Sequence, residues 1–81
     1  MLKVLSSKKC VPCYFLKEDL KKHGIDFIEV DIESPEGLEL ARKFGLRGVP
    51  AVIEGDKLLI FGYNQKKVKE IISKIKNGEV L

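Results

Sequence analysis

The order of short apolar segments along the chain is the feature that most limits its possible folds. Segments rich in β-branched and aromatic residues alternate with segments that repeat apolar residues at helical spacing, and Gly, Pro, Ser or Asn residues separate them. They predict strands at 2–5, 25–32, 49–53 and 58–61 and helices at about 11–23, 34–45 and 64–77. This order, βαβαββα, is an α/β arrangement in which helices flank a four-stranded mixed sheet.

Each predicted helix has an apolar face and residues that define its ends. Pro12 suits the first turn of the first helix, because proline lacks an N–H that would be unpaired there. Ser34 and Asn64 are expected to cap the other two helices. The apolar residues expected on the buried faces are Leu16 and Leu20 in the first helix, Leu38, Ala41 and Phe44 in the second, and Val68, Ile71, Ile72 and Ile75 in the third.

Composition and charge exclude several classes of protein. With 44% hydrophobic residues, 33% charged residues and a mean hydropathy of −0.05, the chain is neither a membrane protein nor a charge-dominated disordered chain. The 15 basic residues exceed the 12 acidic ones by three, and most are lysines at helical spacing, which does not favour nucleic-acid binding. We therefore expect one domain at 1–81 that is monomeric and cytoplasmic, with no nucleic-acid or membrane partner.

The two cysteines form the one constellation with chemistry in it. Cys10 and Cys13 lie two residues apart at a predicted strand-to-helix junction. A structural disulfide across so short a loop gains only about 2 kcal/mol, and a reducing cytoplasm keeps it open. A structural zinc ion needs four ligands, and His23 is the only other good candidate. A metal-carrying module is the alternative function, although such modules usually have the order βαββαβ.

Helix-end electrostatics favour a redox function. The unpaired N–H groups at a helix N-terminus stabilise an anion, so we expect the thiol of Cys10 to ionise more easily than an ordinary thiol. Lys8, at the substrate-binding side, is expected to assist by its charge. Cys13 lies one helical turn further on and is expected to be more buried. Cys10 would attack a partner's disulfide, and Cys13 would then attack Cys10 to release the reduced partner.

The pattern resembles the thioredoxin and glutaredoxin superfamily across nearly the whole chain. One matching motif is Cys10-Val11-Pro12-Cys13, and the other is the segment 44–51, Phe-Gly-Leu-Arg-Gly-Val-Pro-Ala. The resemblance implies a thioredoxin fold with a cis peptide bond before Pro50, beside the cysteines. It also implies that Val49 and Pro50 form a ledge whose backbone pairs with the substrate chain.

Within this superfamily the chain resembles a small glutaredoxin-like dithiol protein, or mini-thioredoxin. It starts directly with a strand, as glutaredoxins do, whereas its second half resembles a thioredoxin. Glutaredoxins usually carry a basic residue where Ser7 stands, and a Gly-Gly-x-Asp type segment where 62–64 stands, and both departures argue against glutathione binding. Thioredoxins usually carry a buried Asp where Val4 stands, so the proton acceptor for Cys13 is unassigned.

The resulting prediction is a protein-disulfide reductase that uses a dithiol and no cofactor. Its partners would be proteins that contain disulfides, together with an electron donor. The residues do not distinguish a thioredoxin reductase from glutathione as that donor.

Overall fold

The computed structural model describes residues 1–79 and has the predicted order of elements. The elements are β1 (Leu2–Ser6), α1 (Val11–Lys22), β2 (Phe27–Asp31), α2 (Pro35–Phe44), β3 (Ala51–Glu54), β4 (Lys57–Phe61) and α3 (Gln65–Lys76). The second and third strands are shorter than predicted, because residues 25 and 26 connect α1 to β2, and Val49 and Pro50 precede β3. None of the helices within the described range is long and apolar enough to span a lipid bilayer.

The strands form one mixed sheet in the order β2-β1-β3-β4. β1 pairs in parallel with β2 and antiparallel with β3, and Leu5 lies opposite both Val30 and Ala51. The parallel pair requires a crossover, which α1 provides. The carboxyl end of β1 and the amino end of β3 therefore meet at one edge of the sheet, where the chain also enters α1.

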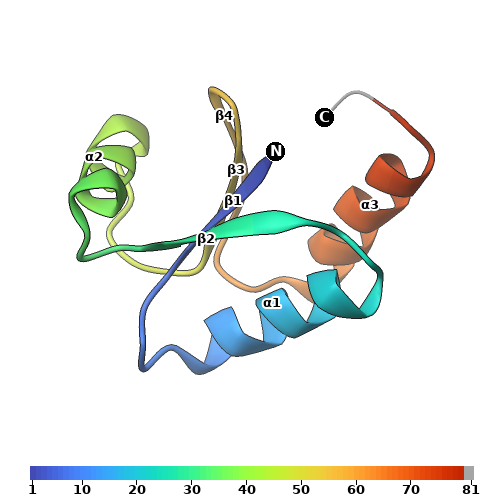
Figure 1. Cartoon of the computed structure of the whole chain (residues 1–81), viewed down its shortest axis with the longest axis horizontal. Coiled ribbons are helices and arrows are strands. Elements are labelled where there is room, and N and C mark those ends of the chain that lie inside the picture. The colour runs from blue at the N-terminus through green and yellow to red at the C-terminus, as the bar shows by residue number, and fades with distance from the viewer. Residues whose placement is uncertain (80–81) are drawn as a thin grey trace.

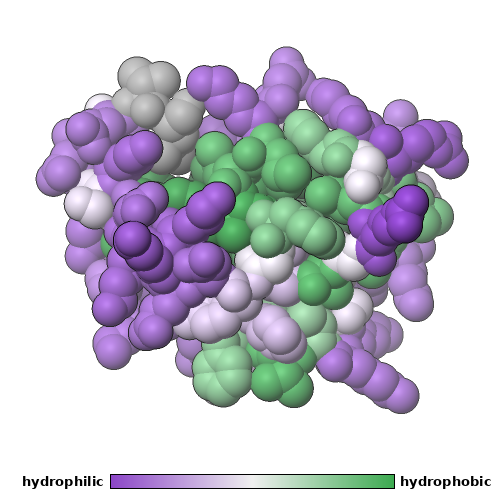
Figure 2. Space-filling model, turned by 180° about the vertical axis from the view of Figure 1, so that it is seen from behind, coloured by the Kyte–Doolittle hydropathy of each residue, from purple (hydrophilic) through white to green (hydrophobic). Residues whose placement is uncertain are grey.

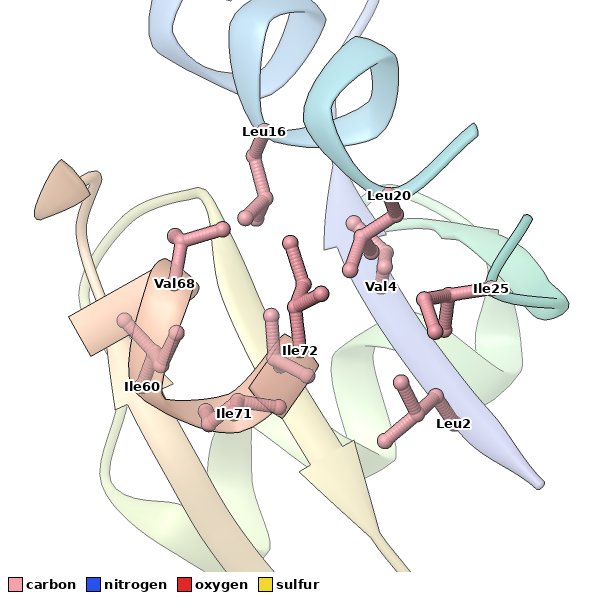
Figure 3. Close-up of a cluster of buried hydrophobic side chains, with 10 residues drawn as sticks. Leu2, Val4, Leu16, Leu20, Ile25, Ile60, Val68, Ile71 and Ile72 are labelled. Atoms are coloured by element: carbon pink, nitrogen blue, oxygen red, sulfur yellow. The ribbon is translucent and has the colours of Figure 1, made fainter. Parts of the chain in front are cut away.

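α1 and α3 cover one face of the sheet, and α2 covers the other (Figure 1). Figure 3 shows side chains from β1, α1 and α3 converging on one apolar cluster. Its members include Leu2, Val4, Leu16, Leu20, Val68, Ile71 and Ile72, and Ile75 packs against them. The predicted inward faces of the first and third helices are thus confirmed.

The predicted inward face of the second helix is wrong at Leu38, whose exposed fraction is 55%. Gly37 is buried instead, and a Cβ atom at this position would collide with the backbone carbonyl of Asp31. Because Gly37 lets α2 approach β2 so closely, the inward face falls on Gly37, Leu40 and Ala41 rather than on Leu38. Phe44, the other residue predicted to be inward, is half-buried.

The predicted helix caps are present. Ser34 Oγ accepts a hydrogen bond from the Gly37 N–H at 3.0 Å, and Asn64 Oδ1 accepts one from the Lys67 N–H at 3.1 Å. Gly45 ends α2 with a φ of 65°, a left-handed conformation that glycine adopts without a steric penalty. These caps fix where α2 and α3 begin and where α2 ends.

We predict that Leu16→Ala destabilises the protein far more than Leu38→Ala. Leu16 is fully buried between α1, α3 and the sheet, so its truncation leaves a cavity and costs about 2–5 kcal/mol. Leu38→Ala removes an exposed side chain from α2 and is expected to change the free energy of unfolding by about 0.5 kcal/mol or less. Urea unfolding of both variants, with the Cys10–Cys13 disulfide intact, measures the difference. Equal losses in the free energy of unfolding would contradict the assignment of the α2 face.

Candidate functional site

Cys10 begins α1 by acting as its N-terminal cap. Its backbone is extended, with φ −98° and ψ 105°, and its Sγ accepts a hydrogen bond from the Cys13 N–H at 3.1 Å. This contact satisfies one of the four N–H groups that a helix leaves unpaired at its start. Pro12 lies in the first turn, as predicted, where its missing N–H costs nothing. The sulfur of Cys10 therefore occupies a position that favours negative charge.

Cys10 and Cys13 are joined by a disulfide, with their Cα atoms 5.2 Å apart. The two sulfurs differ in access, because Cys13 is fully buried and Cys10 is half-buried. An approaching molecule can therefore reach the Cys10 side of the disulfide and not the Cys13 side.

The peptide bond between Val49 and Pro50 is cis, as the resemblance implied. Pro50 precedes Ala51, which lies opposite Leu5 of β1. Pro50 therefore lies at the end of the sheet where β1 ends and the cysteine loop, residues 7–10, begins. Val49 packs against a second, smaller apolar cluster on the α2 face of the sheet, formed by Leu5, Val30 and Ala51. The carbonyl of Pro50 accepts a hydrogen bond from the Gly62 N–H at 2.7 Å. The loop that carries Pro50 is thus fixed to both the core and the end of β4.

A cavity of about 430 Å³ opens beside Cys10, on the side of β2. Lys8 lines it together with Cys10, so the structure brings this predicted residue to the site, with its side chain exposed. Tyr14, Lys17 and Glu29 line the same cavity, and none of the three was predicted as a site residue.

A hydrogen-bonded charge pair forms part of this cavity. Lys17 Nζ of α1 donates to Glu29 Oε2 of β2 at 2.6 Å, and Ser6 Oγ of β1 donates to the same oxygen at 2.8 Å. The hydrogen bond from Lys17, followed by that from Ser6, holds the pKa of the Glu29 carboxyl below its usual value. Glu29 is therefore ionised at neutral pH and forms a salt bridge with Lys17.

No short motif signals the pair, because Lys17 and Glu29 are twelve residues apart and belong to different elements. They meet only because α1 crosses the sheet beside β2, and because strand alternation turns Glu29 to the α1 face. Lys17 and Glu29 are charged residues on amphipathic segments, and most such residues lie on solvated faces. The sequence alone therefore does not indicate that these two belong to a site.

Exposed apolar side chains surround the cysteine loop. Val11, Tyr14 and Phe15 are each at least half exposed, and the Phe15 ring lies 6.4 Å from the Tyr63 ring between centroids. Tyr63 Oη donates to Asp19 Oδ2 at 2.6 Å, a hydrogen bond that raises the pKa of Tyr63 and ties the start of α3 to α1.

Figure 2, which views the molecule from behind, shows further apolar side chains gathered across the middle of that face between polar margins.

The metal-carrying alternative gains no support from the side chains. Within residues 1–79, no group of three or more His, Cys, Asp or Glu side chains is arranged to hold a metal ion. His23 lies at the other end of α1 from the cysteines, where its Nδ1 is 2.9 Å from the carbonyl oxygen of Asp19. His23 therefore cannot join the cysteines as a ligand without a rearrangement of α1.

Comparison with known proteins gives a consistent assignment. The glutaredoxin family model matches residues 2–59. A probable thioredoxin from Archaeoglobus fulgidus is 36% identical over 98% of this chain and 92% of its own length. An uncharacterised glutaredoxin-like 8.6 kDa protein from Clostridium pasteurianum is 34% identical over 91% of this chain and its whole length. The glutaredoxin-like protein NrdH of Escherichia coli is 33% identical over 65% of this chain and 67% of its own.

Solved structures agree with the sequence comparisons. The structure of NrdH-redoxin from Escherichia coli, a glutaredoxin-like protein described by its thioredoxin-like activity profile, has a TM-score of 0.73 at 27% identity and covers 86% of this chain and 92% of its own. A glutaredoxin from Archaeoglobus fulgidus has a TM-score of 0.71 at 32% identity, covering 88% and 84%. With its mixed sheet and its Cys10–Cys13 disulfide, the chain belongs to the glutaredoxin family of the thioredoxin superfamily, whose chemistry is thiol–disulfide exchange.

Proposed function

We propose that the chain is a dithiol protein-disulfide reductase in which Cys10 is the nucleophile and Cys13 the resolving thiol. The observation that carries this proposal is the unequal access of the two linked sulfurs at the start of α1. The half-buried sulfur is the one that accepts a helix N–H, and the buried sulfur is within bonding range of it. This arrangement supports attack by Cys10 on an outside disulfide, followed by internal release.

The reaction consists of two thiol–disulfide exchanges. The Cys10 thiolate attacks one sulfur of the partner's disulfide, the partner's S–S bond breaks, and the departing sulfur takes up a proton. The Cys13 thiol then loses its proton and its thiolate attacks Cys10 Sγ. The Cys10–Cys13 bond forms as the partner's other sulfur leaves, so two electrons pass from the dithiol to the partner. The chain ends in the oxidised form described above, and an external reductant restores it.

The surroundings of Cys10 support a protein as the substrate. Lys8 adds positive charge beside the cysteine loop, which favours the thiolate. The cis Val49–Pro50 segment leaves a backbone edge near the cysteines that can pair with an extended substrate chain. The exposed side chains of Val11 and Phe15 offer apolar contact area around it.

We infer that the electron donor is a reductase of the thioredoxin reductase type. Ser7 supplies no positive charge where glutaredoxins usually carry a basic residue, which weakens the case for glutathione. The related NrdH-redoxin is described as having a thioredoxin-like activity profile, which supports the same donor class here.

Cysteine substitutions test the assigned roles. Cys10→Ser is expected to lower insulin reduction to the rate without protein, because no accessible nucleophile is left. Cys13→Ser is expected to accumulate a covalent mixed disulfide with insulin, visible by mass spectrometry without reductant, because the resolving step is blocked. Ser73→Ala, on the exposed side of α3, is the control and should behave as the wild type. Full activity of Cys10→Ser would refute the mechanism.

A coupled assay tests the electron donor. NADPH with a bacterial thioredoxin reductase is expected to sustain insulin reduction at least about tenfold faster than NADPH with glutathione and glutathione reductase. A tenfold rate ratio corresponds to a difference of roughly 1.4 kcal/mol in activation free energy. Ser7→Lys restores the basic residue that glutaredoxins usually carry and is expected to raise the glutathione-dependent rate selectively. Faster turnover of the wild type with glutathione would overturn the assigned donor while leaving the cysteine roles intact.

A further inference from the structure

The resolving step needs a thiolate at a fully buried sulfur. Cys13 is 0% exposed, and burial disfavours the charged form of a thiol. Val4, in the middle of β1 beneath α1, is also 0% exposed and carries no group that can accept a proton. If Cys13 acts as proposed above, some other group must offset the cost of its negative charge, and this inference rests on that function.

Lys17 is the charged residue of α1 nearest to Cys13 along the inward side of the helix. The two residues are four apart, so their Cβ atoms are about 6 Å from each other on the same face. Side chains in a helix lean toward its N-terminus, which directs the stem of Lys17 toward the turn that carries Cys13. The side chain of Lys17 is 20% exposed, so most of its length packs against the protein.

One hydrogen bond holds the Lys17 ammonium, and a second holds the carboxylate that accepts it. Glu29 Oε2 accepts its hydrogen bond at 2.6 Å, and Ser6, which is 1% exposed, fixes that oxygen with a second hydrogen bond at 2.8 Å. Ser6 is the last residue of β1 and directly precedes the loop that leads to Cys10. The pair is therefore anchored to the same strand end as the cysteines, and it lines the same cavity as Cys10.

Other charges surround this region, and Lys21 of α1 contributes to the lowered pKa of the Glu29 carboxyl, although less than Lys17 does. Asp31 of β2 and Lys8 of the cysteine loop line the cavity, and the Asp31 carboxylate accepts a hydrogen bond from the Glu33 N–H. On the side of β3, the segment 49–51 is Val-Pro-Ala and has no titratable side chain. The hydrogen bond between Tyr63 and Asp19 ties α1 to the start of α3, further along the helix.

We propose that Lys17 is a positioning residue that stabilises the Cys13 thiolate during resolution, with Glu29 and Ser6 holding its ammonium over the cavity. When Cys13 gives up its proton to solvent, the positive charge of Lys17 offsets the new negative charge on sulfur. Lys17 itself neither forms a bond nor exchanges a proton. The exchange remains balanced as written above, with the Cys13–Cys10 bond forming as the Cys10–partner bond breaks.

The direct test titrates Cys13 alone. In a Cys10→Ser background with ¹³C-labelled cysteine, NMR reports the pH midpoint at which the Cys13 thiol ionises. Lys17→Met keeps the apolar stem, removes the ammonium and leaves the Glu29 carboxylate uncompensated. It is expected to raise this midpoint by about 0.5 to 1 pH unit, the size of shift that one nearby charge produces through a partly aqueous medium.

Two matched variants separate charge from structure. Lys17→Arg keeps the charge and is expected to restore the wild-type midpoint. Lys21 lies one turn further along α1, and its exposed side chain places Nζ 3.9 Å from Glu18 Oε2. Lys21→Met should leave the midpoint of Cys13 unchanged. Urea unfolding of each variant verifies that a shift does not arise from loss of the fold.

A second readout follows the resolving step itself. Reduced protein with both cysteines is mixed with an equimolar aromatic disulfide, such as dithiobis(nitrobenzoate), whose thiolate absorbs light. Attack by Cys10 releases the first chromophore, and attack by Cys13 on Cys10 releases the second in a phase that does not depend on reagent concentration. Lys17→Met is expected to shift the pH profile of the second phase upward and to affect the first phase less.

The outcomes distinguish this inference from the proposed function. An unchanged midpoint in Lys17→Met, a shift equal to that in Lys21→Met, or a Cys13 thiol that stays protonated to the alkaline limit of folding in every variant would overturn the role of Lys17. Release of only one chromophore by the wild type would instead overturn the resolving role of Cys13.

Discussion

The contact between the Cys13 N–H and Cys10 Sγ is the interaction on which the site depends. The Cys10 sulfur takes the place that a serine or aspartate oxygen occupies at most helix starts, so it lies where backbone N–H groups and the helix dipole favour negative charge. That placement needs β1 to end one short loop before α1, and α1 to pack firmly on the sheet. The apolar cluster shared by β1, α1 and α3 supplies this firmness, because Leu16 and Leu20 anchor the helix that Cys10 caps.

Most of the fold follows from local sequence patterns. Val68, Ile71 and Ile72 lie on one helical face, and Ser34 and Asn64 cap their helices, because these features depend on residues within one turn of each other. The error at Leu38 has a different origin. Helical spacing alone allows two overlapping inward faces for α2, and the close approach of Gly37 to the Asp31 carbonyl, which selects one of them, is a tertiary contact.

The site shows the same division between local and long-range information. The cysteine pair and the proline before β3 are short motifs, and the cis peptide at Pro50 was predictable through the family resemblance although not from the dipeptide itself. The Lys17–Glu29 pair was not predictable, because its formation depends on the register of β2 against β1 and on the path of α1 over β2, the outer strand on that side of the sheet. A charge on an edge strand is indistinguishable from a solvated residue until its partner is placed.

The position of this charge pair fits the small size of the chain. A short chain buries a smaller share of its surface than a larger domain does, so an ionised group in the middle of its core would consume much of its stability. Val4 keeps the centre of β1 apolar, and among the described residues the buried polar set contains only Ser6. Lys17 and Glu29 lie instead at the β2 edge, where water still solvates one side of the pair and the desolvation cost is low. Because the pair lies at that edge, the apolar core that fixes α1 stays intact.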